Sequence, residues 1–171
     1  IDNINITTLN DSGVPTVTYG LVNDGQSGKI ILNAGNIYSK YHAIDNDEAA
    51  TFEMNGGSVR TYDSGYATVR NNQENEGAST FKIIAGSIIG PTNAIYNLYN
   101  GNVIIEGGTL ERTTSGIAIY NNSTGTINLN NGNVNYLSEA IDFSNKKYKE
   151  FCIKDAEVTM MNTNFFPTNL D

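Results

Sequence analysis

The chain has 171 residues, the size of one ordinary domain, and only 16% of them are charged. Its net charge of −8 argues against nucleic acid and heparin-like polyanions as partners, because binding such anions requires clustered Lys and Arg. There is no run of about 18 apolar residues that would predict a membrane span. A single cysteine, Cys152, excludes an internal disulfide.

Residues 1–27 fit the repeat that follows them poorly. Ile4 and Ile6, and then Leu21 and Val22, predict a partial coil or an N-terminal cap. The chain opens at Ile1 without an initiating Met or a signal segment, which favours an excised or mature part of a larger multidomain protein.

Residues 28–165 repeat one phrase six times, apolar–x–apolar–x–x–Gly–x–apolar, with Ala156 in place of the last glycine. The glycine positions are 22, 29, 22, 24 and 24 residues apart. The copies begin at Ile30, Phe52, Phe81, Val103, Ile127 and Phe151. Alternation of apolar and polar residues predicts two half-buried strands per repeat, with a bend at the glycine, and the fixed period predicts a solenoid.

A third apolar column follows in each repeat and predicts a third strand. Its members are Ile44, Val69, Ile95, Ile119 and Ile141, continued by Phe165. Three aligned strands per turn predict an all-β parallel β-helix of about six coils, a rod roughly 29 Å long at ~4.8 Å per coil. Residues 1–171 are therefore predicted to form a single β-solenoid domain, with residues 166–171 as a C-terminal tail beside Pro167.

An asparagine follows the third strand on four coils, at Asn46, Asn71, Asn97 and Asn121. Stacked amides hydrogen-bond along a column and satisfy backbone groups at a corner, so a structural ladder is the favoured interpretation. Contact with a ligand is the alternative.

The outward positions of the third strand hold the candidate ligand-binding residues. Tyr96 and Tyr120 are predicted to stack one coil apart as a flat ladder, with Tyr99 on the loop beyond them. Such a ladder either stabilises the stack or binds sugar rings or a protein partner. Asp45 and Arg70, one coil apart in the same column, predict a surface ion pair.

Asp45, Asp47 and Glu48 are the candidate metal ligands, because clustered carboxylates suit Ca²⁺. The alternative is a polar corner loop, and no other cofactor is predicted. Glycoside hydrolysis needs two carboxylates about 5–10 Å apart. Asp45 and Asp142 lie four coils apart, about 19 Å, and cannot form such a pair. Cys152 falls on an outward strand position, as a predicted surface thiol.

The phrases Gly-Gly-Ser-Val (56–59), Gly-Gly-Thr-Leu (107–110) and Ser-Gly-Ile-Ala-Ile-Tyr-Asn-Asn (115–122) resemble right-handed parallel β-helix repeats, of the pectate-lyase-like kind, in bacterial cell-surface and adhesin proteins. The resemblance implies a secreted or cell-surface module, acting as an adhesin or a stalk, that binds a polysaccharide or a host or cell-surface protein. It also admits a polysaccharide lyase or glycoside hydrolase. The polygalacturonase-like motifs Asn-Thr-Asp, Asp-Asp, Gly-His-Gly and Arg-Ile-Lys are absent, so catalysis is the second interpretation.

Overall fold

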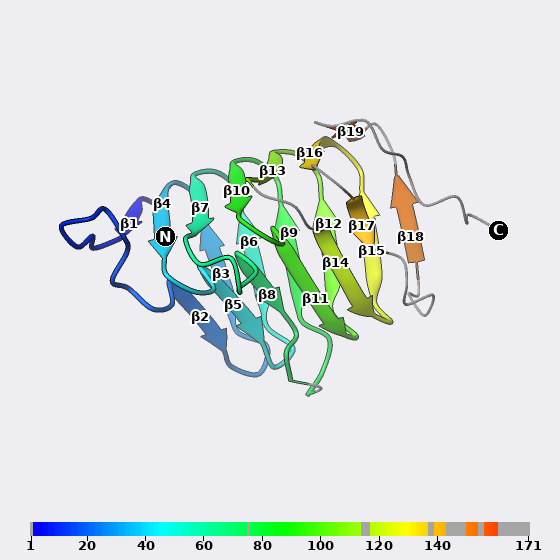
Figure 1. The fold of residues 1–171 in the computed structure, drawn as a ribbon. Helices are drawn as coiled ribbons and strands as arrows, with labels where there is room; N and C mark the ends of the chain where they lie inside the picture. The colour runs from blue at the N-terminus through cyan, green and yellow to red at the C-terminus, as the bar shows by residue number, and fades with distance from the viewer. Residues whose placement is uncertain are drawn as a thin grey trace.

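The structure is a computed structural model that describes residues 2–74, 76–113, 117–136, 139–142, 150–153 and 156–160. Side chains are described as far as Asn131, except that of Arg112. Within these ranges every regular element is a β-strand, and the strands wind into a parallel β-solenoid (Figure 1). The predicted all-β solenoid with three strands per turn is confirmed.

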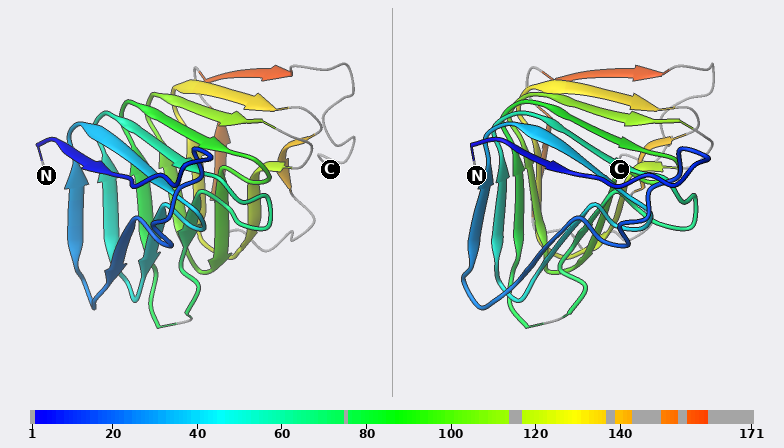
Figure 2. Two further views of the ribbon diagram at one scale, coloured as in Figure 1. Left: turned by 60° about the vertical axis from the view of Figure 1, so that its left-hand side comes forward. Right: turned by 90° about the vertical axis from the view of Figure 1, so that its left-hand side faces the viewer.

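Three parallel sheets run along the solenoid, and each turn of the chain adds one strand to each sheet. The first sheet contains β3 (Lys29–Leu32), β6 (Thr51–Met54), β9 (Thr80–Ile83), β12 (Asn102–Ile105), β15 (Thr126–Leu129) and β18 (Glu150–Ile153). The second sheet contains β1 (Ile4–Ile6), β4 (Gly35–Ser39), β7 (Ser58–Thr61), β10 (Ser87–Gly90), β13 (Thr109–Arg112), β16 (Gly132–Tyr136) and β19 (Ala156–Met160). The third sheet contains β2 (Leu21–Asp24), β5 (Ile44–Asp47), β8 (Val69–Asn71), β11 (Ile95–Tyr99), β14 (Ile117–Ser123) and β17 (Glu139–Asp142). Viewed along the axis, the sheets enclose a three-sided interior (Figure 2).

About four turns carry described side chains on all three strands, fewer than the six coils that the repeat count predicts. These turns run from β3 to β14, and the backbones of β15 to β19 continue the three sheets beyond them. Before them, β1 and β2 add one strand each to the second and third sheets. The predicted tail at residues 166–171, and Phe165 at the end of the third column, lie outside the described residues.

Strand register follows the sequence repeat residue for residue. In the first sheet the successive partners are Ile30, Phe52, Phe81, Val103, Ile127 and Phe151. In the second they are Ile37, Val59, Ile88, Leu110, Val134 and Val158. In the third they are Leu21, Ile44, Val69, Ile95, Ile119 and Ile141. The alignment of the repeats on their glycines is thus the alignment of the strands.

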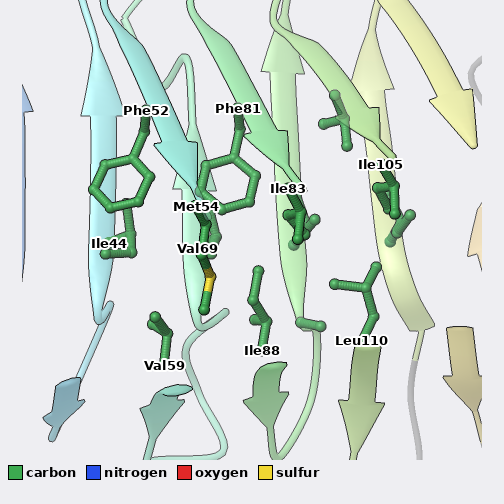
Figure 3. Packing of buried hydrophobic residues seen from close by; sticks show 14 of the residues in the cluster. Ile44, Phe52, Met54, Val59, Val69, Phe81, Ile83, Ile88, Ile105 and Leu110 are labelled. Carbon is green, nitrogen blue, oxygen red and sulfur yellow. The ribbon is translucent and has the colours of Figure 1, made fainter. Parts of the chain in front are cut away.

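The inward side chains form one continuous apolar core along the axis (Figure 3). Phe52 and Phe81 are completely buried and stack with ring centroids 5.6 Å apart. Burial of a side chain of this size contributes roughly 1.5–3 kcal/mol, so the stacked columns stabilise a fold without a disulfide. The side chains between the inward positions point outward. Among them, Lys82 forms an ion pair with Glu106 at 2.8 Å.

The repeated glycine is required by the stacking of the coils. Gly86 has a φ of 101°, in the region that side chains rarely adopt. A Cβ there would lie 2.7 Å from the carbonyl oxygen of Gly57, the equivalent glycine one coil earlier. The bend after the first strand therefore recurs with a glycine because each copy rests directly on the backbone of the last.

Candidate functional site

One outward column of the third sheet brings together the predicted ligand-binding residues. Neighbouring strands β2, β5, β8, β11 and β14 place Val22, Asp45, Arg70, Tyr96 and Tyr120 in register. These strands lie side by side along the solenoid (Figure 1). The next position of the column, Asp142 on β17, has no described side chain. We call this set the outer column.

Asp45 and Arg70 form the predicted ion pair, but the pair is far more buried than a surface pair. Arg70 donates from Nε to Oδ1 of Asp45 at 2.8 Å and from Nη2 to Oδ2. Asp45 is only 6% exposed, and the Arg70 side chain is 25% exposed. Hydrogen bonding to Asp45 raises the pKa of Arg70. Two charges that cancel are thus fixed side by side in the outer column.

Tyr96 and Tyr120 stand next to each other as predicted, with ring centroids 4.9 Å apart. The predicted flat ladder is wrong, because the rings are inclined by 58°. Burial, and then the neighbouring phenols of Tyr120 and Tyr99, raise the pKa of Tyr96. Its hydroxyl group therefore keeps its proton at neutral pH and can donate a hydrogen bond.

A cluster of rings lies where the chain enters the third sheet, and the sequence interpretation missed it. Its members are Tyr19, Tyr41, His42 and Tyr66, which we call the corner cluster. Tyr41 and Tyr66 stack with ring centroids 4.2 Å apart. His42 meets Tyr66 edge-on at 5.3 Å and stacks against Tyr19 at 6.2 Å. The signal was present in the repeat. Aromatic residues recur just before the inward residue that begins the apolar column of the third sheet. Tyr19 and His42 lie two positions before it, and Tyr41 and Tyr66 lie three positions before it.

His42 is 7% exposed, and its Nδ1 lies 2.7 Å from the carbonyl oxygen of Ala67. A carbonyl oxygen only accepts, so Nδ1 carries the proton. Burial lowers the pKa of His42, and the positive charge of Arg70 lowers it further, against the opposing effects of the Ala67 hydrogen bond and Asp45. The ring is neutral at pH 7, with Nε2 as an acceptor.

A groove of about 390 Å³ joins the outer column to the corner cluster. Arg70, Tyr96 and Tyr120 of the outer column line it together with His42 and Tyr66 of the corner cluster, and Gln73 and Asn93 line it as well. Of the five predicted ligand-binding residues, three line this groove. Asp45 holds Arg70 in place. Tyr99 does not line the groove and is the last residue of β11 rather than part of a loop, with 47% of its surface exposed.

The asparagines occupy the opposite ends of the same strands and are structural in their contacts. Nδ2 of each donates to Oδ1 of the next at 2.7–2.9 Å, in the order Asn23, Asn46, Asn71, Asn97 and Asn121. The amides also donate to backbone carbonyls, such as that of Asn102 from Asn71 at 3.1 Å. The predicted ladder is confirmed and begins one coil earlier, at Asn23, a position that Leu21-Val22-Asn23 shares with Ile44-Asp45-Asn46.

The three candidate metal ligands do not converge. Asp45 is bound to Arg70, Asp47 accepts a hydrogen bond from the Glu74 amide at 2.8 Å, and Glu48 is half-buried. Among the residues that the structure describes, no group of three His, Cys, Asp or Glu is placed to hold a metal ion. Calcium binding stays a prediction.

A second hollow, of about 550 Å³, lies over the second sheet. Tyr38, Arg60 and Tyr62 line it, and the Arg60 guanidinium lies 5.1 Å from the centre of the Tyr38 ring. The side chain of Cys152, the predicted surface thiol, lies outside the described residues.

Fold and groove together define a parallel β-solenoid with an aromatic groove on one face. In the described part of the chain, no helix has the length and apolar character to cross a membrane. Comparison of the chain with protein-family models, with curated proteins and with solved structures gives no match.

Proposed function

We propose that the chain is a non-enzymatic module of a secreted or cell-surface bacterial protein and binds carbohydrate in the groove. The observation that carries the proposal is the groove between the tilted Tyr96–Tyr120 pair and the corner cluster. Its ring faces suit the C–H faces of sugars, and its polar groups suit hydroxyl groups.

Two polar groups of the groove, those of Arg70 and His42, are held in place by the protein itself. Asp45 fixes the Arg70 guanidinium through two hydrogen bonds, and Ala67 fixes the His42 ring through one. Groups that are already ordered lose little conformational entropy on binding, which favours affinity for a weakly interacting ligand such as a sugar.

Binding is favoured over hydrolysis by the chemistry of the lining. Among the described side chains, those that line the groove include no carboxylate, whereas the hydrolase mechanism requires two. A polysaccharide lyase or glycoside hydrolase is accordingly the second candidate.

A rigid stack of coils also suits a stalk that holds its groove away from a cell wall. The placement at a bacterial surface is supported by the resemblance of the repeats to cell-surface β-helices and by a surface rich in uncharged polar residues. A protein on another cell is an alternative partner for the same aromatic surface.

A glycan-array screen of the purified chain, with and without calcium, tests the proposal. We expect reproducible binding to at least one glycan, with about tenfold or greater loss on Tyr96→Ala and Tyr120→Ala, because each substitution removes a ring face. Tyr62→Ala is the matched control, since Tyr62 is 49% exposed and lines the other hollow. Circular dichroism and thermal unfolding establish that each variant is folded.

Three outcomes would contradict the proposal or parts of it. Absence of binding to any glycan on the array would favour a spacer or a protein-binding segment. Turnover of pectin, alginate or glycosaminoglycan would favour the enzyme. Binding that survives both groove substitutions would place the ligand elsewhere. Separately, loss of binding in chelator would support the calcium prediction.

A further inference from the structure

The charges around the groove bear on which glycans it accepts. Resting on the proposed function, we infer that the groove selects uncharged glycans and discriminates against uronic-acid and sulfated chains. The inference rests on Arg70, the cationic side chain among the described residues that line the groove, and on the charged groups around it.

Arg70 is already paired with a carboxylate, that of Asp45. Its Nε and Nη2 groups donate to the two oxygens of Asp45, which is the two-point geometry a uronate would need to displace. Asp45 is 6% exposed and follows Ile44 of the core, so it cannot swing into solvent to make room. The remaining N–H groups of the guanidinium are left for neutral acceptors such as sugar hydroxyl groups.

The surroundings of the pair are acidic. Asp47 lies close enough to Asp45 and Glu74 for their charges to raise its pKa, an effect that follows that of burial. The charges of Asp24, Glu76, Glu74 and Asp47 act on Glu48 in the same direction. On the other side, Lys40 lies over the Tyr41 ring at 5.2 Å, outside the groove lining. Together with the net charge of −8 over the chain, the described carboxylates near the pair disfavour the approach of a polyanion.

The other polar groups of the groove are neutral at pH 7. His42 donates its single proton to Ala67, and its second nitrogen accepts. Tyr96 keeps its phenolic proton, and Gln73 and Asn93 supply neutral amides. Ring faces, neutral donors and neutral acceptors together match a chain of hydroxyl groups without carboxylate or sulfate.

Isothermal titration calorimetry at pH 7 with matched oligosaccharides tests the inference. The probes are neutral hexasaccharides of glucose, xylose, mannose and galactose, hexagalacturonate, and a heparin-derived hexasaccharide. We expect at least one neutral probe to bind about tenfold or more tightly than both charged probes. Equal or tighter binding of a charged probe would overturn the inference and leave the proposed function standing. Binding of no probe would overturn the proposed function, and with it the inference.

Asp45→Asn tests the cause. The substitution keeps the shape and one acceptor oxygen but frees the charge of Arg70, so we expect hexagalacturonate affinity to rise about tenfold with a salt dependence that the native chain lacks. Glu53→Gln is the matched control, since Glu53 pairs with Lys29 at 3.4 Å on the first sheet. It should change the affinity for neither class. A folded Asp45→Asn chain with unchanged uronate affinity would contradict the role given to the ion pair.

Discussion

The two ends of the third-sheet strands use polar side chains in opposite ways. At one end Asn23, Asn46, Asn71, Asn97 and Asn121 repeat the same residue on five successive strands, and all are at least nine-tenths buried. At the other end the equivalent positions change from coil to coil, through Tyr19, His42, Ala67 and Asn93. The first end is closed by its own hydrogen bonds, whereas the second opens onto the groove.

The difference follows from the symmetry of a solenoid. An amide carries both a donor and an acceptor, so identical copies satisfy one another along the stack, and repetition of one residue produces a closed structure. A ligand that does not share the repeat of the coils needs different groups on each coil. A column that repeats one residue type therefore indicates a structural role. A column whose residue type changes from coil to coil indicates where a binding site can lie.

The largest expected effect tests the register on which this comparison depends. Ile105 is 1% exposed in the interior, so Ile105→Asp buries an unpaired charge and should unfold the chain. Ile104 is its neighbour on β12 and faces outward, and Ile104→Asp should be tolerated. Circular dichroism and urea unfolding distinguish the two outcomes. Equal damage from both substitutions would show that inward and outward positions are wrongly assigned.

A smaller effect is expected from breaking the asparagine ladder. Asn71→Ala removes the donor to Oδ1 of Asn97 and to the carbonyl of Asn102, both in the buried corner. Each buried group left without a donor costs roughly 1–3 kcal/mol, so the loss of two donors should lower the free energy of unfolding by about 2–6 kcal/mol, measured by urea unfolding.

Asn55→Ala is the control for the ladder, because Asn55 donates to Asn33 at 2.9 Å on the exposed side of the stack. Its cost should stay within about 1 kcal/mol, measured by urea unfolding under the same conditions. Similar losses of unfolding free energy for Asn71→Ala and Asn55→Ala would mean that a hydrogen bond in the buried ladder stabilises the fold no more than one between exposed side chains.

The sequence predicted those features that the stacking repeats. The core columns, the strand register and the Asn46–Asn121 ladder all follow from residues such as Phe52 and Phe81 recurring in phase. The surroundings of the groove were predicted only in part. Tyr96, Tyr120, Asp45 and Arg70 share one column, so the period placed them together. His42 and Tyr66 come from two different columns, so alignment of the coils could not bring them together. The burial of the ion pair and the tilt of the rings depend on side-chain packing at the corner, which a period does not encode.

The smallest expected effect concerns the pH dependence of stability and His42 of the corner cluster. Burial lowers the pKa of His42 below its usual 6.5, so the unfolded chain takes up the proton first as the pH falls. The free energy of unfolding should therefore be highest above pH 6.5 and fall as the pH drops through the lower pKa of the folded state. Arg70 and Asp45 are the charges that act on the ring, with opposite signs, and Tyr19 and Tyr66 contact it.

His42→Gln separates this effect from the titration of carboxylates. The glutamine amide can donate to Ala67 but has no proton to gain, and the chain has no other histidine. Urea unfolding between roughly pH 5 and 7.5 should then show a shallower loss of stability than in the native chain. An NMR titration of the single His ring gives the pKa directly. A pKa at or above 6.5 would mean that water reaches His42 well enough to stabilise its charged form. The groove would then hold a protonated ring at mildly acidic pH instead of a neutral acceptor.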